Sequence, residues 1–172
     1  KVGTRHIRSD LAELHKRSIL AAVGHAALKV VVDCGSGATS EITPAVLREM
    51  GCKVTALNAQ PDGHFPGRDP EPTEENLELL RRTVRALGAD LGIAHDGDGD
   101  RMVAVDEKGV FIGGDKLLAV FAKREVKKAV VVPVDTSMAI DEMLPKAKVY
   151  RTRVGDVYVA QEVRRRKADF GG

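Results

Sequence analysis

Short apolar runs alternate with amphipathic stretches along most of this 172-residue chain, and this alternation is the feature that most constrains its fold. Short apolar runs bounded by glycine predict buried parallel strands, whereas apolar residues spaced three or four apart predict helices. The predicted helices cover residues 11–23, 44–50, 74–87, 115–124, 137–144 and 156–166, and the predicted strands cover 28–33, 53–58, 91–95, 129–134 and 148–151, with a further strand starting at 168–170. This order is typical of an α/β fold. The two α/β halves of the chain are consistent with a diverged repeat.

A predicted hairpin separates the two halves. Residues 102–106 and 110–112 read as strands on either side of a Glu-Lys-Gly turn. We place the domain boundary near residues 106–113, where no sharp linker composition fixes it. The expected domains are residues 1–106 and residues 107–172.

Three residues carry signals for helix ends. Thr43 and Thr73 are predicted to cap the helices that follow them, because a threonine oxygen accepts hydrogen bonds from free N–H groups in the first turn. Gly88 is predicted to end the second of these helices, since glycine adopts the left-handed conformation that often follows a helix.

The run from His95 to Arg101 places Asp96, Asp98 and Asp100 at alternate positions, with glycines between them. Three carboxylates this close repel one another unless a cation neutralises them, and hard oxygen ligands at this density favour Mg²⁺ or Ca²⁺. The glycines allow the backbone to fold tightly around one ion. A plain Asp-Gly turn is the simpler alternative, although a turn needs only one such pair. The run follows a predicted strand, where open α/β sheets bind ligands.

A calcium loop of the EF-hand type is a rival interpretation, with Glu107 at its twelfth position. The sixth position of that loop requires glycine, and here it is Arg101. The flanking segments also read as strands rather than helices. A guanidinium beside an acidic cluster suits a phosphoryl group, whose oxygens can take metal on one side and a forked donor on the other. The pattern therefore favours Mg²⁺-assisted phosphate chemistry.

Five segments together resemble the α-D-phosphohexomutases, a family that includes phosphomannomutase/phosphoglucomutase and phosphoglucosamine mutase. The segments are DGDGDR at 96–101, VDCGSGA at 32–38, FPGRDPEPTEENL at 65–77 (in an archaeal-like form), GGDK at 113–116 and TRVGD at 152–156. The resemblance implies two consecutive three-layer α/β/α domains with mixed, mainly parallel sheets. They would be the second domain of a four-domain enzyme and an incomplete third.

The resemblance also implies a function. Such enzymes interconvert hexose 1-phosphate and 6-phosphate (mannose, glucose or glucosamine phosphate) through a phosphoserine and a bisphosphate intermediate. Asp96, Asp98 and Asp100 would hold Mg²⁺ and Arg101 would orient the transferred phosphoryl group. Thr152, Gly155 and Asp156 would form a turn facing the sugar.

Several partners follow from the same resemblance. The phosphoserine would come from a missing first domain and a phosphate clamp from a missing fourth domain, so the chain is expected to be part of a longer enzyme and inactive alone. A homodimer is a further expectation. The alternative is a non-catalytic α/β module that binds Mg²⁺ or phosphate.

Other candidate residues have weaker signals. The turn GSGAT at 35–39 lacks the lysine of a phosphate-binding P-loop and reads as a structural turn. His64 and Arg68 could meet phosphate or a neighbouring domain, or be solvated. His95 is expected to pack or to support the loop rather than to bind metal, because adjacent strand residues point to opposite faces.

Composition excludes some classes of partner. A net charge of +2 is too small to indicate binding to nucleic acid or to a membrane surface. No apolar run approaches the length of a membrane span. Cys34 and Cys52 lie in apolar surroundings and are expected to be reduced core thiols. These features predict a cytoplasmic protein.

Overall fold

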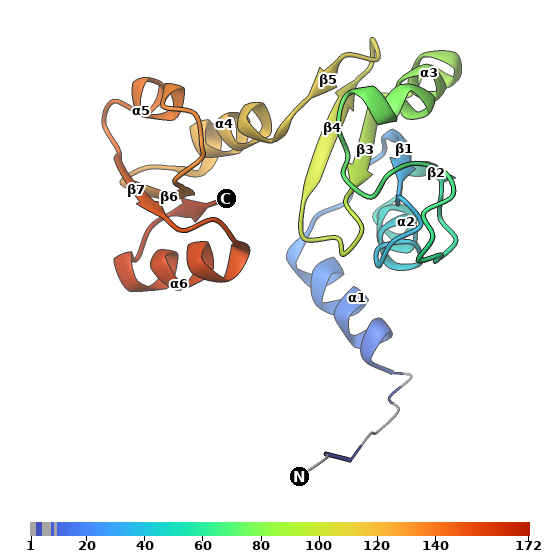
Figure 1. Ribbon diagram of the computed structural model, residues 1–172, viewed down its shortest axis with the longest axis horizontal. Coiled ribbons are helices and arrows are strands. Elements are labelled where there is room, and N and C mark those ends of the chain that lie inside the picture. The colour runs from blue at the N-terminus through green and yellow to red at the C-terminus, as the bar shows by residue number, and fades with distance from the viewer. Residues whose placement is uncertain (1–2, 5–7, 9) are drawn as a thin grey trace. The chain divides into compact units, whose positions relative to one another are not determined.

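The computed structural model describes residues 3–4, 8 and 10–172, and the chain divides into two compact units, Lys1–Phe111 and Ile112–Gly172. We refer to them as unit 1 and unit 2. Each unit is built on its own sheet (Figure 1). Among the helices of the described residues, none combines the length and the apolar character needed to cross a bilayer.

Unit 1 is built on a mixed sheet, sheet A, with strand order β2-β1-β3-β4-β5. The strands are β1 (Lys29–Asp33), β2 (Lys53–Leu57), β3 (Leu91–His95), β4 (Met102–Asp106) and β5 (Phe111–Ile112). β1 pairs in parallel with β2 and β3, and β4 runs antiparallel to β3. Because β1 is an inner strand and covered on both faces, its consecutive residues Val30, Val31 and Val32 are all buried.

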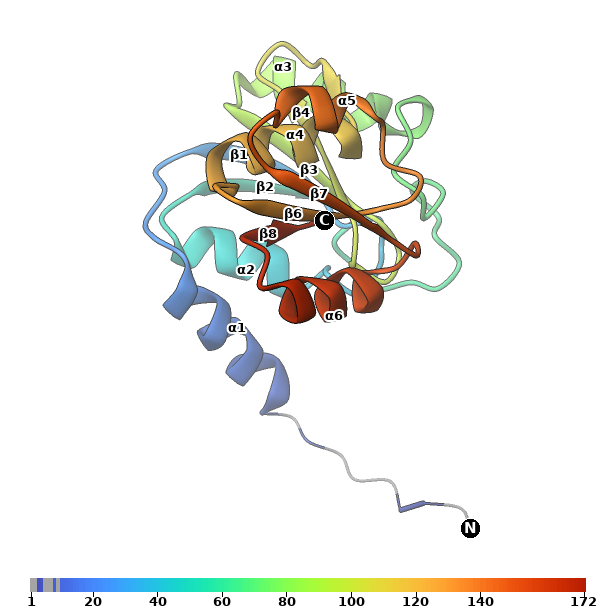
Figure 2. The same ribbon diagram turned by 90° about the vertical axis from the view of Figure 1, so that its left-hand side faces the viewer.

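Two helices cover opposite faces of sheet A, as Figure 2 shows: α2 (Ile42–Glu49) on one face and α3 (Glu78–Leu87) on the other. Leu80 and Val84 of α3 are fully buried in one core cluster with Val31, Ala94 and Val105 of the sheet. The preceding helix α1 (Leu11–Ala22) has no buried residues and packs on α2. The packing of α3 therefore supplies the apolar core beneath β1 and β3.

The predicted caps at Thr43 and Thr73 are wrong. α2 begins before Thr43, and the hydroxyl of Thr43 lies 3.3 Å from Nε2 of His95 instead of capping the helix. After Thr73 the chain first makes a 3-10 turn, η1 (Glu75–Leu77), and α3 has no side-chain cap. The predicted stop is confirmed, since Gly88 is left-handed with φ +55°.

Unit 2 is built on sheet B, which is parallel throughout with strand order β7-β6-β8. Its elements are α4 (Gly114–Glu125), β6 (Ala129–Pro133), α5 (Ala139–Met143), β7 (Lys148–Thr152), α6 (Asp156–Arg166) and β8 (Phe170–Gly171). Sheet B lies between α4 and α5 on one side and α6 on the other (Figure 2). The predicted fold class, consecutive α/β/α domains, is confirmed.

The two units repeat one design where a helix returns to the sheet. α3 ends in left-handed Gly88 and α6 ends in left-handed Lys167. Each is followed by Ala, Asp, an apolar residue and Gly, as ADLG at 89–92 and ADFG at 168–171. The four residues lead into β3 and β8, which pair in parallel with β1 and β6, the first strand of each sheet along the chain.

The aspartate of this repeat links the returning chain to β1 in unit 1 and to β6 in unit 2. Asp90 Oδ2 accepts a hydrogen bond from the N–H of Lys29 at the start of β1 (2.8 Å), and Asp169 Oδ2 accepts one from Ala129 at the start of β6 (3.0 Å). The same carboxylate oxygen of Asp169 also accepts from Lys127 N–H. Equivalent carboxylates therefore fix the edge where the strands of each sheet begin.

Both cysteines are free thiols buried in unit 1, as predicted from their apolar surroundings. Cys34 directly follows β1 and is fully buried. Burial raises the pKa of its thiol to about 11, so the thiol stays protonated at neutral pH.

Candidate metal and phosphate site

The candidate site lies at the carboxyl edge of sheet A, where the loops after β1 and β3 meet. The chain leaves β1 toward β2 on one side, while β3 lies on the other side, and such a reversal of strand order opens a crevice. The two loops touch directly, since Ala38 N–H donates to the carbonyl of Gly97 (3.0 Å). A Cβ on Gly37 would lie 2.3 Å from that carbonyl oxygen, so only glycine fits.

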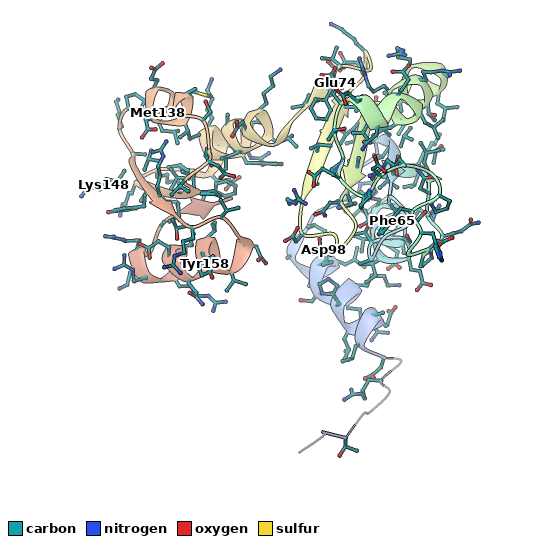
Figure 3. All side chains as sticks on the ribbon, in the orientation of Figure 1. Phe65, Glu74, Asp98, Met138, Lys148 and Tyr158 are labelled. Atoms are coloured by element: carbon teal, nitrogen blue, oxygen red, sulfur yellow. The ribbon has the colours of Figure 1, made fainter. Side chains whose placement is uncertain are left out.

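The three predicted metal ligands converge in the loop between β3 and β4. One carboxylate oxygen from each of Asp96, Asp98 and Asp100 lies within 4.8 Å of the others. Asp96 is buried, whereas Asp98 and Asp100 are exposed, and Figure 3 shows Asp98 at the turn of the loop. Three hard oxygen donors at this separation, two of them open to solvent, fit a divalent cation that keeps some of its water, such as Mg²⁺.

Asp96 anchors the loop from inside. Its Oδ1 accepts hydrogen bonds from the N–H groups of Gly99 and Arg101 (both 3.1 Å), and its Oδ2 accepts one from Nε of Arg101 (2.9 Å). Burial alone would raise the pKa of Asp96, but these hydrogen bonds and the guanidinium charge hold it below its usual range. The Asp96 carboxylate is therefore ionised and fixed in place.

Asp100 experiences the repulsion that the sequence predicts. Partial burial, the hydrogen bond with Asp96 and the charges of Asp96 and Asp98 together raise the pKa of Asp100 above its usual value. A bound cation would reverse that effect, because it favours the ionised form of every carboxylate around it.

Arg101 reaches from the acidic loop to a residue that the sequence analysis missed, Glu71. Its NH1 donates to Oε1 of Glu71 (2.9 Å), and its NH2 lies 2.8 Å from Oε2. Both guanidinium nitrogens of the fork therefore face one carboxylate, while Nε faces Asp96. The Arg101 side chain is 61% exposed, which keeps it accessible to a ligand.

A second missed contact lies beneath the loop, between Arg68 and Asp33. Nε of Arg68 lies 3.1 Å from Oδ1 of Asp33, and both side chains are almost fully buried. Arg68 also donates through NH2 to the carbonyl of His95 (2.5 Å), directly before Asp96. The sequence left open whether Arg68 is solvated, and the structure places it as an internal support of the acidic loop.

The two histidines near the site do not join the acidic cluster. The His64 side chain is 96% exposed and pairs with Asp62. The His95 ring lies against Thr43 of α2, and burial lowers its pKa. His95 therefore packs against α2, as expected from its position on β3.

The predicted sugar-facing residues lie in unit 2, so they are not part of the acidic cluster of unit 1. Thr152 is the last residue of β7, Gly155 precedes α6 with φ +126°, and Asp156 is the first residue of α6. The carboxylate of Asp156 accepts a hydrogen bond from the N–H of Val157 (2.7 Å). The turn thus combines a glycine that allows close backbone approach with the start of a helix.

These features place unit 1 in a class: an α/β domain that presents a cluster of three carboxylates and an accessible arginine at the carboxyl edge of its sheet. Comparison with known families makes the assignment specific. Residues 9–109 match the family described as phosphoglucomutase/phosphomannomutase, alpha/beta/alpha domain II, and residues 113–172 match its alpha/beta/alpha domain III. The chain belongs to the phosphoglucomutase/phosphomannomutase family.

Individual relatives agree with this assignment. The chain is 58% identical over 171 residues to a protein of Methanocella arvoryzae named "Probable phosphoglucosamine mutase". The match covers 99% of this chain and 39% of that protein. It is 58% identical over 174 residues to a protein of the same name from Methanococcoides burtonii, covering 100% of this chain and 40% of that protein. The chain thus spans about two fifths of the length of these relatives.

A solved structure agrees with the fold of the chain. The crystal structure of a phosphoglucomutase/phosphomannomutase family protein from Burkholderia thailandensis matches with a TM-score of 0.84 and 26% identity. The match covers 94% of this chain and 37% of that one. The resemblance drawn from the sequence motifs is confirmed at the level of the family.

Proposed function

We propose that this chain is part of a Mg²⁺-dependent phosphohexomutase that interconverts hexose 1-phosphate and 6-phosphate, with glucosamine phosphate as the first substrate to test. The choice of sugar is supported by the names of the relatives, which are phosphoglucosamine mutases. The observation that carries the proposal is the convergence of three carboxylates within 4.8 Å beside the fork of Arg101. Metal and guanidinium on neighbouring sides are what a transferring phosphoryl group requires.

Each residue of the site has a distinct task in this proposal. Asp96, Asp98 and Asp100 hold the cation, which when bound supplies positive charge to offset that of the phosphoryl group. Arg101 orients the phosphoryl oxygens through its planar fork and stabilises their charge. The turn formed by Thr152, Gly155 and Asp156 faces the sugar.

Other parts of the reaction belong to the longer protein. The phosphoserine and the phosphate clamp would come from its first and fourth domains, and the reaction would pass through a hexose bisphosphate. The span of about two fifths of the relatives' length supports this division. The free buried thiols favour a reducing compartment, the cytoplasm.

The test is an assay of the full-length protein with Mg²⁺ and the 1-phosphates of glucosamine, glucose and mannose, with each 6-phosphate measured directly. Interconversion of at least one sugar is expected, whereas the 172-residue chain alone should bind Mg²⁺ without turnover. If the full-length protein binds Mg²⁺ and phosphate but converts no hexose phosphate, the non-catalytic binding module is the better description.

A further inference from the structure

Arg101 pairs with three carboxylates: Asp100 lies 3.6 Å from Nε, and the two shorter contacts, with Asp96 and Glu71, differ in burial. Asp96, which holds Nε, has a side chain only 3% exposed. Glu71, which faces NH1 and NH2, has a side chain 53% exposed. An exposed ion pair contributes little to stability, because water competes for both charges. Asp96 is thus the fixed partner of Arg101 and Glu71 the exchangeable one.

The contact with Glu71 has the geometry of phosphate recognition. The two carboxylate oxygens of Glu71 face the two nitrogens of the Arg101 fork at 2.9 and 2.8 Å. Two oxygens of a phosphoryl group bind an arginine in the same forked way. Glu71 therefore occupies the position that a phosphoryl group would take on this arginine.

The backbone of Glu71 is held beside the acidic loop independently of its carboxylate. Asn76 Nδ2 donates to the carbonyl of Glu71 (2.5 Å). The preceding Pro70 packs near Gly97, where a Cβ would lie 3.1 Å from the Pro70 ring. The carboxylate can therefore leave Arg101 by rotating its own side chain, without moving the chain that carries it.

From these three observations we propose that Glu71 is a positioning residue that holds the Arg101 fork until phosphate arrives and is then displaced by the phosphoryl oxygens. The inference rests on the proposed function, since it requires phosphate to bind beside the acidic loop. Asp96 keeps Nε fixed throughout, so the fork stays aimed at the site after Glu71 leaves. The exchange trades one anion for another, which limits the time that Arg101 spends unpaired.

The test uses the 172-residue chain labelled with ¹⁵N, Mg²⁺ and inorganic phosphate as the probe. Phosphate affinity is measured from the Nε–H signal of Arg101 and from calorimetry, for the natural chain and for Glu71→Gln. Glutamine has nearly the same shape but lacks the charge, so phosphate should bind about fivefold more tightly, because a competing exposed ion pair has been removed. The matched control is Glu74→Gln, which removes an exposed carboxylate facing Arg81 from the same loop and should leave phosphate affinity unchanged.

The outcomes separate this inference from the function on which it rests. If Arg101→Ala abolishes the phosphate response but Glu71→Gln weakens binding or leaves it unchanged, Glu71 is a structural brace and only the displacement is wrong. If phosphate binds equally well to Arg101→Ala, the proposed phosphate site is wrong. An equal gain in Glu71→Gln and Glu74→Gln would indicate a general charge effect and would also overturn the displacement. Melting temperatures recorded in parallel identify any variant that fails to fold.

Discussion

Sheets A and B are alike at the edge where their strands begin, and they differ at the edge where their strands end. At the first edge Asp90 accepts a hydrogen bond from the start of β1, and Asp169 accepts the equivalent one from the start of β6. At the second edge β1 ends in the buried Asp33, whereas β6 ends in Pro133. Within the described residues, the only cluster of three carboxylates close enough together to hold a metal ion follows β3 in unit 1. The comparison teaches that the edge where the strands begin has the same structural contacts in both units, whereas the edge where they end carries the candidate site in unit 1 only.

The largest expected effect is the loss of Mg²⁺ binding in Asp98→Asn. Asp98 is exposed and offers one of only three clustered carboxylates, so its loss removes a third of the protein donors. Titration of the 172-residue chain with Mg²⁺ should show no saturable binding in this variant, whereas Asp115→Asn in unit 2 and His95→Ala should retain most of it. Tight Ca²⁺ selectivity that depends on Glu107 would instead support a calcium loop.

The next effect concerns two forked arginines, one in each unit. Arg101 faces Glu71, and Arg151 in unit 2 donates through both terminal nitrogens to Asp141. Arg101→Lys in the full-length protein should lower turnover, since lysine lacks the planar fork. The loss of transition-state stabilisation should be about 2–4 kcal/mol. Arg151→Lys should change turnover much less. Near-normal turnover of Arg101→Lys, with Mg²⁺ affinity and melting temperature unchanged, would leave its guanidinium only a structural role.

A smaller effect, on stability, is expected at Gly92 and Gly171, which occupy equivalent positions in the two units. A Cβ on Gly92 would lie 2.8 Å from Cγ2 of Val84, and a Cβ on Gly171 would lie 2.5 Å from Cγ2 of Val163. Each Gly→Ala change should cost about 1–3 kcal/mol of stability, because it forces a methyl group between helix and sheet. Hydrogen exchange should show that each variant weakens protection only in its own unit. Loss of protection in both units would mean that they unfold as one.

The smallest effect is a pH dependence at Asp169. Hydrogen bonds from the backbone N–H groups of Ala129, Lys128 and Lys127 lower the pKa of this carboxyl. Because the folded pKa is the lower one, the stabilisation is present above the unfolded pKa of about 3.9 and is lost as pH falls through the folded value. Asp169→Asn should therefore reduce protection of unit 2 at pH 7 and have little effect near pH 2. An equal loss at both pH values would show that the charge is not involved.

Much of the fold was predictable because its signals are local. The strands 91–95 and 102–106 and the helix 156–166 are predicted with the bounds that the structure shows, since the spacing of apolar residues that predicts each of them lies within the segment itself. The predicted cap at Thr43 failed because its hydroxyl lies against His95, a residue from elsewhere in the chain.

The candidate site was predictable only in part. The acidic residues and Arg101 lie within six consecutive positions, so their spacing alone predicted a cluster. Glu71 lies 30 residues from Arg101 along the sequence, in a long loop rich in proline and glycine that has no periodicity. No local pattern could pair these two residues. The same holds for Arg68 and Asp33, which lie far apart in the sequence and in contact in the fold.

The buried contact between Arg68 and Asp33 has a consequence for the order of folding. The end of β1 and the carbonyl that precedes the acidic loop are both held by one side chain from the loop between β2 and η1. Closing such distant segments costs chain entropy before the contact forms, and non-local contacts of this kind slow folding. We therefore expect the acidic loop to acquire its final shape late, after the strands beneath it have paired. A refolding chain would then gain its sheet first and the proposed affinity for Mg²⁺ last.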